Sequence, residues 1–329
     1  MNYTLETVNC PLCGKNNYKP YLTNVKELYG GSDNFFTIVK CCDCQMVFTN
    51  PRPTKDTIGY FYPDSAGYYQ PRLRSDKDNS IKEKIIRTVL SNYYGYEFES
   101  PFDGFSAFFL KMLFSRKLAV AHIPRFVAGG RLLDIGCSWG SYAFRMARYG
   151  WEVHGIEINK KAAEYAKNTL GLNNIFNGFF DEYKCSEDFF DVVHMSMALE
   201  HIHEPAECLN RVYKILKKGG QLIISVPDIS GFEARIYGRY AHMLHVPQHL
   251  NHFSPATIKS MLNKIGFTVE KIVHQSSAKD LVASAQYLDN KLPYLVLKWS
   301  PIHKILVKPF VFLLSICEKT SRMSIYAEK

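Results

Sequence analysis

The stretch that decides the fold is RLLDIGCSWGSYAF, at residues 131–144. Its opening RLLDIG is typical of a short buried strand, and a glycine-rich turn then leads into a predicted helix over about 140–149. The turn Gly136–Gly140 fits G-x-S-x-G, the elbow that presents a nucleophilic serine in α/β-hydrolases, here Ser138. It fits equally well a strand-to-helix turn beneath a nucleotide.

The surroundings of the turn favour the nucleotide. A hydrolase elbow normally follows several strands of the sheet, whereas this turn follows the first strand of the α/β region. Glu157 lies 21 residues after Gly136, at the end of the predicted strand WEVHGIEI. Nucleotide-binding α/β folds place an acid there for the ribose hydroxyls. Asp228 and His249 follow in the order of a hydrolase triad, so that alternative stays open, but we expect Ser138 to line a cofactor pocket.

From residue 130 onward, strand-like and helix-like segments alternate, which predicts an α/β fold with a parallel sheet. Asn159 and Ser254 are predicted N-caps, and Gly171 and Gly266 predicted helix ends. A further helix is expected over about 204–216, ending in KKGG. The expected strands after WEVHGIEI are NIFNG, FFDVVHM, QLIISVP, FTVEKIVHQ and MSIYAEK.

Over roughly residues 120–329 the sequence resembles the class I S-adenosylmethionine-dependent methyltransferases. LLDIGCSWG resembles their first motif, GIEIN the second, and the block from FFDVVHM to ISVPD their fourth and fifth strands. The resemblance implies an α/β Rossmann-like sheet of seven strands, six parallel and the last antiparallel between the fifth and sixth.

The resemblance also implies cofactor contacts. Ser138 replaces the usual third glycine of the first motif, and Phe179 replaces an acid often found near the adenine; for Phe179, core packing is an equal alternative. The implied cofactor-binding residues are Asp134, Gly136, Cys137, Ser138 and Gly140 around the methionine part, Glu157 at the ribose, Ile158 and Phe179 at the adenine, and Met195 toward the acceptor.

Acid–base candidates follow the fourth strand. Sugar C-methyltransferases of similar architecture use a Glu-His pair at this position, so the resemblance makes His201, beside Glu200, the first candidate base; capping of the next helix is the alternative. The loop HMLHVPQHLNHFS contains four histidines, of which His249 is the second candidate. Some quinone O-methyltransferases carry an acidic metal ligand where this chain has Met197, so we expect no catalytic metal.

Two C-x2-C pairs stand near the start of the chain, Cys10 with Cys13 and Cys41 with Cys44. Four thiolates at this spacing predict a closed structural zinc site, although 27 intervening residues are more than usual for a zinc ribbon. The segment after Cys44 resembles bacterial methyltransferases with an N-terminal zinc-binding domain, many of them thought to act on sugars or polysaccharides. We therefore expect a zinc-ribbon-like module over 1–65, a helical linker or cap over 66–126, and a methyltransferase domain over 127–329 with a helical insertion at 277–320.

The composition narrows the functional classes. The net charge of +9 suits an anionic partner. In residues 1–65, however, Lys and Arg nearly balance Asp and Glu, which argues against a dedicated nucleic-acid-binding surface and predicts no DNA partner. Nine cysteines and a start without a signal-like segment predict a cytoplasmic protein. Residues 103–127 and 292–317 mix apolar and basic residues, so they either contact a membrane surface peripherally or cap the acceptor pocket.

The expected activity is methyl transfer to a small molecule or glycan, an activated or lipid-linked sugar in particular. An RNA methyltransferase, a quinone or lipid O-methyltransferase and a non-catalytic binding module are the alternatives. Neither the acceptor atom nor the oligomeric state follows from the sequence.

Overall fold

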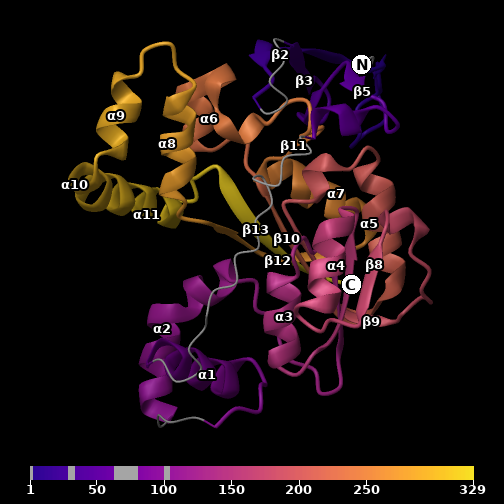
Figure 1. Cartoon of the computed structure of the whole chain (residues 1–329), viewed down its shortest axis with the longest axis vertical. Helices are drawn as coiled ribbons and strands as arrows, with labels where there is room; N and C mark the ends of the chain where they lie inside the picture. The colour runs from indigo at the N-terminus through magenta and orange to yellow at the C-terminus, as the bar shows by residue number, and fades with distance from the viewer. Residues whose placement is uncertain (1–2, 29–33, 63–80, 100–103) are drawn as a thin grey trace. The chain divides into compact units, whose positions relative to one another are not determined.

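The computed structural model describes residues 3–28, 34–62, 81–99 and 104–329 (Figure 1). Their internal contacts divide the chain into two units. The first unit comprises Met1–Ser65, Met197–Asn210 and Ser225–Ile325; the second comprises Ala66–Ser196, Arg211–Ile224 and Tyr326–Lys329. The expected three-part division of the chain stays a prediction, and residues 66–80 of the expected linker lie outside the described residues.

A seven-stranded sheet is formed by the segments that the alternating pattern predicts. Its strands lie in the order β12-β13-β10-β9-β6-β7-β8, and β6 pairs in parallel with both β7 and β9. The bounds are β6 Arg131–Ile135, β7 Glu152–Glu157, β8 Asn174–Asn177, β9 Phe190–Ser196, β10 Leu216–Pro227, β12 Thr268–His274 and β13 Arg322–Glu328. The predicted Rossmann-like class is confirmed, with the last strand between the fifth and the sixth.

The last strand, β13, runs antiparallel to its neighbour β10. Lys329, after the end of β13, exchanges backbone hydrogen bonds with Gly219 and Gly220 near the start of β10. At the other end, the N–H of Asp228 donates to the carbonyl of Ser321 at 2.9 Å. Reciprocal pairs of this kind belong to an antiparallel ladder.

Four helices follow the strands as expected: α3 Ser141–Arg148, α4 Lys160–Asn168, α5 Pro205–Ile215 and α7 Pro255–Ile265. The side chains of Asn159 and Ser254 cap α4 and α7, and Gly266 ends α7 in the left-handed conformation. The end of α5 differs from the prediction, because the KKGG segment belongs to β10 instead of closing the helix. The exchange with Lys329 accounts for this, since a distant strand partner decides the conformation of these residues.

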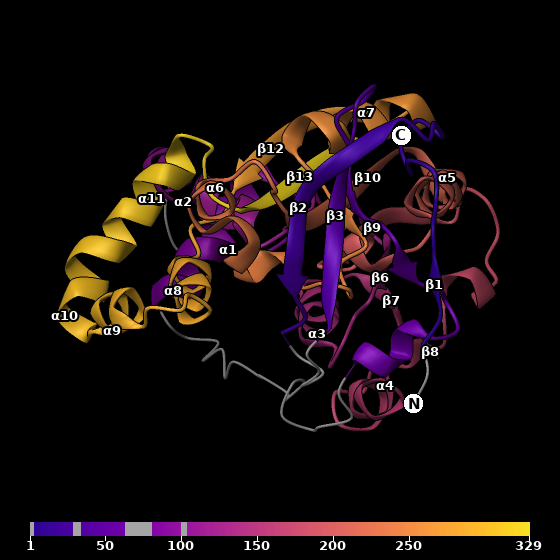
Figure 2. The same cartoon turned by 90° about the horizontal axis from the view of Figure 1, so that it is seen from above.

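The N-terminal residues form a second, four-stranded sheet in the first unit, in the order β11-β4-β3-β2. Its strands are β2 Tyr18–Lys26, β3 Phe35–Cys41, β4 Val47–Thr49 and β11 Asn251–His252, and a short pair joins β1 Leu5–Glu6 to β5 Arg52–Pro53. In Figure 2 the long strands β2 and β3 run side by side. Strand β11 lies about 200 residues further along the chain, in the loop with four histidines, so this loop supplies the fourth strand of the sheet.

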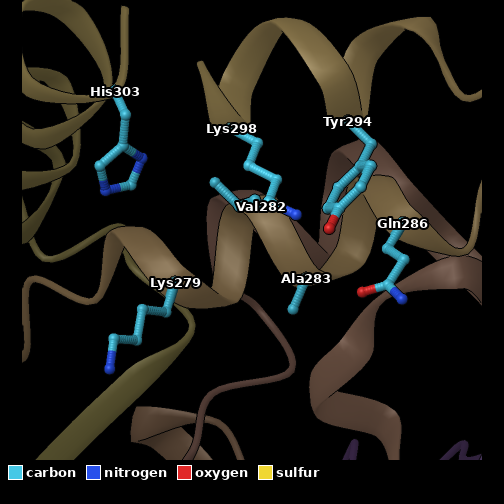
Figure 3. A pocket seen from close by; sticks show the side chains of 7 residues that line it. All are labelled: Lys279, Val282, Ala283, Gln286, Tyr294, Lys298 and His303. Carbon is cyan, nitrogen blue, oxygen red and sulfur yellow. The ribbon is translucent and has the colours of Figure 1, made fainter. Parts of the chain in front are cut away.

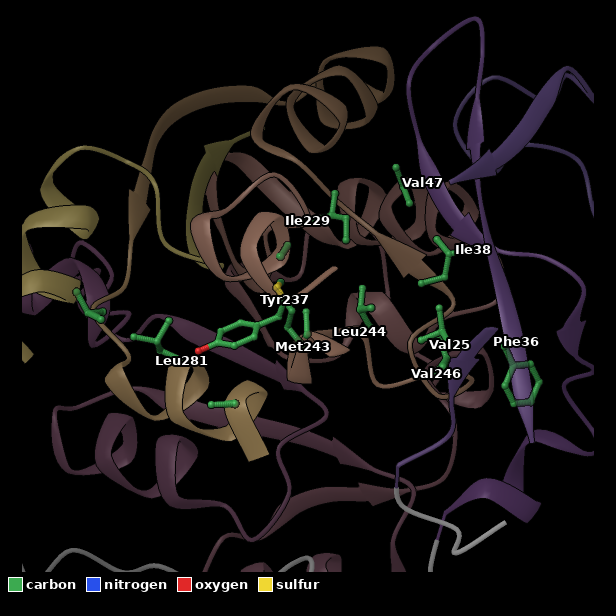
Figure 4. Packing of buried hydrophobic residues seen from close by; sticks show 14 of the residues in the cluster. Val25, Phe36, Ile38, Val47, Ile229, Tyr237, Met243, Leu244, Val246 and Leu281 are labelled. Carbon is green, nitrogen blue, oxygen red and sulfur yellow. The ribbon is translucent and has the colours of Figure 1, made fainter. Parts of the chain in front are cut away.

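This N-terminal sheet shares a hydrophobic core with residues 229–246. Ile38 and Val47 contribute from the sheet, and Leu244 and Val246 from the later segment (Figure 4). A module this small buries little surface alone, and the shared core supplies what it lacks.

The remaining helices are α1 Ile81–Tyr93, α2 Gly104–Val120, α6 Phe232–Tyr237, α8 Ala278–Gln286, α9 Leu292–Lys298, α10 Ser300–Ile302 and α11 Lys308–Ile316, with a π-helical turn, η6, at His303–Val307. Helices α8 to α11 lie together in both views (Figures 1 and 2). Within the described residues no single helix is long and apolar enough to cross a membrane. Among the same residues, only the combined helices Leu292–Lys298 and Ser300–Ile316, which are bent by 66°, reach the length and apolar composition of a membrane span.

Candidate functional site

The carboxylate of Glu157 is fixed where β7 ends. One oxygen accepts a hydrogen bond from the backbone N–H of Ser138 and the other from that of Asn159, both at 2.8 Å. Burial raises the pKa of Glu157, and these backbone donors oppose the rise. Since each carboxylate oxygen has a second lone pair, both can still accept a hydrogen bond from a ribose hydroxyl.

The turn after β6 brings backbone close to that carboxylate. Gly136 and Gly140 have φ of 76° and 77°, and Ser138 has φ of 51° although it carries a side chain. A Cβ on Gly140 would lie 2.9 Å from the Cβ of Ala166, so glycine is required there by both conformation and packing. Cys137 is buried, and burial together with nearby Asp134 raises the pKa of its thiol, so this cysteine is unreactive.

Asp134 is hydrogen-bonded to His194, which in turn contacts His122, and neither histidine is predicted from the sequence. Nδ1 of His194 lies 2.6 Å from an Asp134 oxygen, and Nε2 of His194 lies 2.9 Å from Nδ1 of His122. The ring of Tyr142 stacks on His194 with centroids 3.7 Å apart. Burial lowers the pKa of His122 well below its usual range. These contacts fix the orientation of the Asp134 carboxylate.

The residues predicted near the adenine differ in exposure. Ile158 and Phe179 are 58% and 49% exposed, so core packing does not account for Phe179. Both are apolar side chains on an open surface, which suits a planar base. Met195 is fully buried in β9, so its side chain belongs to the core and only its backbone can reach a ligand. Ser196, the next residue, is half-buried.

Glu200 lies in the short turn η3 Leu199–His201 of the first unit, and its side chain is completely buried. Neither carboxylate oxygen has a hydrogen-bond partner among the described residues. Burial raises the pKa of Glu200 to about 8, so at neutral pH this group is mostly a protonated acid. It can donate a proton or a hydrogen bond, which an ordinary surface glutamate cannot do.

His201, the next residue, is oriented from two sides. Its Nδ1 lies 3.0 Å from the hydroxyl of Tyr62 and 3.0 Å from the carbonyl oxygen of Gln248. Burial lowers its pKa to about 4, so the ring is neutral near pH 7. When Nδ1–H donates to the carbonyl, Nε2 holds the lone pair that a general base needs. These contacts of Nδ1 are with Tyr62 and Gln248 and not with α5, whose first residue is Pro205.

His249 stands beside His201, with ring centroids 4.6 Å apart, and its Nδ1 lies 2.9 Å from the carbonyl oxygen of Met243. One ligand atom from each of Glu200, His201 and His249 fits within a 4.8 Å cluster, close enough for a shared proton or a metal ion. The ring centroids of His245 and His249 are 4.8 Å apart, so His245 lies next to this pair. His252 instead hydrogen-bonds the hydroxyl of Thr49.

The alternative hydrolase triad is not formed. Asp228 pairs with His274, at 2.9 Å, instead of with His249. Its other oxygen accepts hydrogen bonds from Ser230. His249 is turned to a backbone carbonyl. Among the described residues, no carboxylate is hydrogen-bonded to His249 as a Ser-His-Asp mechanism requires.

The four predicted thiol ligands converge in the N-terminal module. Sγ of Cys10 lies 3.4 Å from that of Cys44, and Sγ of Cys13 lies 3.6 Å from that of Cys41. All four sulfur atoms fall within 4.8 Å of one another. A tetrahedron with Zn–S bonds of about 2.3 Å has edges of roughly 3.8 Å, so the donor set and spacing fit zinc. Cys42 is exposed and lies outside the cluster.

Comparisons with known proteins agree with this fold. Residues 110–272, just under half of the chain, match the family described as "Methyltransferase domain". The mitochondrial ubiquinone biosynthesis O-methyltransferase of Schizosaccharomyces pombe is 32% identical over 30% of this chain and 38% of its own length. The tRNA U34 carboxymethyltransferase of Methylococcus capsulatus is 26% identical over 62% of this chain and 66% of its own.

Among solved structures, a SAM-dependent methyltransferase from Archaeoglobus fulgidus is 24% identical, covers 69% of this chain and all of its own, and has a TM-score of 0.46. The chain spans less than two thirds of the length of the curated relatives named above. Residues 110–272 are therefore similar to a methyltransferase domain, and strands β6 to β10 with β12 and β13 form a seven-stranded Rossmann-like sheet.

Proposed function

We propose that this chain transfers a methyl group from S-adenosylmethionine to a hydroxyl or an acidic carbon of a small acceptor. The observation that carries the proposal is the Glu157 carboxylate, fixed by the N–H groups of Ser138 and Asn159 at the end of β7. A ribose diol fits such a paired acceptor, and the exposed Ile158 offers an apolar surface for the base. The bound cofactor would supply an electrophilic methyl group.

The chain's own contribution to the chemistry is proton removal from the acceptor. We assign this role to His201, which follows β9 by five residues, on the carboxyl side where ligands bind in α/β folds. Its ring is neutral, and Tyr62 and Gln248 hold Nδ1, so Nε2 is the basic atom. Glu200 is in its neutral acid form beside it and does not compete for the proton.

We place the acceptor among activated or lipid-linked sugars. Support comes from the resemblance of the cysteine module and of the Glu200-His201 pair to those of sugar methyltransferases. A lipid-soluble phenol is the second candidate, since relatives of this domain are named ubiquinone biosynthesis O-methyltransferases. A tRNA acceptor is less well supported, because basic residues are not concentrated in residues 1–65.

Zinc belongs to the proposal as a structural ion. Cys10, Cys13, Cys41 and Cys44 would hold it with no open position, so it would stabilise the module and take no part in methyl transfer. The turn after each cysteine pair supports this role, because Gly14 and Gln45 adopt positive φ directly after Cys13 and Cys44.

The test uses the purified chain and S-adenosylmethionine labelled in the methyl group. Nucleotide-linked sugars, a catechol-type phenol and bulk tRNA are offered as acceptors in parallel. We expect label in the sugar fraction and a loss of about 10²- to 10⁴-fold in His201→Gln, with cofactor affinity unchanged. His203→Gln is the matched control, because the ring of His203 bonds the carbonyl oxygen of Pro53 and glutamine can replace that donor. Label in the phenol alone would move the assignment to the second candidate, and label in none would refute the acceptor classes.

A further inference from the structure

The outer face of helices α9 to α11 is unusually apolar for a surface. The inner side chains of this segment, including Val307 and Val311, are buried in the core of the first unit, and Leu297 and Ile302 pack against that core. The outer side chains have no such cover. Those exposed are Leu292, Leu295, Val296, Trp299, Ile305, Leu306, Phe310, Phe312, Leu313 and Ile316, and we call them the α9–α11 surface.

The charge of the same segment has one sign. Residues 291–317 contain four lysines, at 291, 298, 304 and 308, and no aspartate or glutamate. All four lysines are exposed. Exposed apolar side chains interspersed with lysines match an interfacial helix in contact with anionic lipid.

A pocket of about 310 Å³ lies between α8 and the segment from α9 to η6. Figure 3 shows the side chains of Lys298 and Tyr294 reaching from α9 toward Val282 and Ala283 of α8, with His303 on a separate segment at the left of the view. Neither Lys279, at one end of the pocket, nor Lys298 forms a salt bridge among the described residues. Lys298 is a cationic donor in the lining of this pocket and suits a phosphate group, whereas Figure 3 shows the side chain of Lys279 pointing away from it.

We propose that the α9–α11 surface docks on an anionic lipid bilayer and that the pocket at Lys298 receives a lipid phosphate. The bend of 66° at Trp299 favours helices lying in the interface over a straight span of the roughly 30 Å hydrocarbon layer. A second copy of the chain is a poorer occupant, because it would bring lysines to face lysines. This proposal does not depend on the proposed methyl transfer.

Vesicle binding tests the proposal with the full chain and no cofactor. Vesicles of equal parts phosphatidylglycerol and phosphatidylcholine are compared with pure phosphatidylcholine in a sedimentation assay. We expect binding to the anionic vesicles, with a blue shift of Trp299 fluorescence that Trp299→Phe removes, since Trp299 is 61% exposed while Trp151 is buried. Leu295→Glu with Leu306→Glu should lower the affinity more than tenfold, and Lys298→Gln with Lys304→Gln roughly 25-fold, about fivefold for each lysine.

Matched controls distinguish vesicle binding by the α9–α11 surface from non-specific binding by exposed apolar or basic side chains. Phe35→Glu changes an exposed aromatic side chain on β3, and Lys259→Gln removes an exposed lysine of α7; both should bind vesicles as the wild type does. An excess of inorganic phosphate that displaces the chain only partly supports lipid as the source of the phosphate, and complete displacement overturns it. Equal binding by all variants, no binding to anionic vesicles, or a dimer in solution that Leu295→Glu dissociates would also overturn the proposal. None of these outcomes bears on whether the methyl transfer occurs.

Discussion

The backbone N–H of Ser138 donates a hydrogen bond to Oε2 of Glu157 at 2.8 Å, and this contact joins the turn after β6 to the end of β7. The donor is available because Ser138 adopts a φ of 51°, which glycine usually provides in this turn. The serine that first suggests a nucleophile thus acts through its backbone. Several measurable consequences depend on this turn and on the buried groups around it.

Substitution of Gly140 by alanine should destabilise the turn. A left-handed φ costs a non-glycine residue about 1–2 kcal/mol, and the close contact with Ala166 adds about 1–3 kcal/mol. Gly171→Ala is the matched control, because Gly171 has φ of 69° and nothing within 4 Å of its added Cβ. Urea unfolding should show a larger loss for Gly140→Ala than for Gly171→Ala, and equal losses would mean that the neighbouring side chains relax freely.

Glu200 should make the folded state less stable as the pH rises. The group has a pKa of about 8 when folded against 4.5 otherwise, so below pH 4.5 both states are protonated and no penalty exists. Between pH 4.5 and 8 only the unfolded chain ionises, which lowers the free energy of unfolding by about 5 kcal/mol at most.

Glu200→Gln keeps the shape of the neutral acid and should remove this part of the pH dependence, giving a variant more stable than the wild type at pH 8. Denaturant midpoints at pH 5 and pH 8 measure the effect. Glu187→Gln, at an exposed position, should leave the slope unchanged. If Glu200→Gln unfolds with the same pH dependence as the wild type, Glu200 is not the buried acid responsible.

The zinc site can be tested with two neighbouring cysteines. Cys44 belongs to the cluster of four thiols, whereas Cys42 is exposed and outside it. Metal analysis should find one zinc per chain in the wild type and in Cys42→Ser and none in Cys44→Ser. Loss of the ion should also expose residues 1–62 to protease, because structural zinc contributes directly to folding. Full zinc content in Cys44→Ser would refute the assigned ligand set.

Local pattern was sufficient to predict most of the main sheet. Hydrophobic runs, the caps at Asn159 and Ser254, and the glycine turns all act within a few residues, and the structure has strands and helices at those positions. The end of α5 was predicted less well, because pairing with Lys329 over a hundred residues away decides it.

The same limit applies to the candidate sites. The hydrogen bonds from Asp134 through His194 to His122 join two strands and a turn that are distant in the sequence, and no spacing rule reveals them. The pairing of β4 with β11, which ties the cysteine module to the histidine-rich loop, is equally long-range. The clustering of the four cysteines and the position of Glu157 at the end of β7 were predictable, because both follow from spacing in the chain.

The affinity of Glu157→Gln for S-adenosylmethionine, measured by calorimetry, tests the central claim most directly. Replacing one acceptor oxygen by an amide and removing the charge should weaken binding by roughly ten- to a hundredfold, while the melting temperature stays near that of the wild type. Glu164→Gln, on the exposed face of α4, should bind as the wild type does. Wild-type affinity in a folded Glu157→Gln variant would contradict the account.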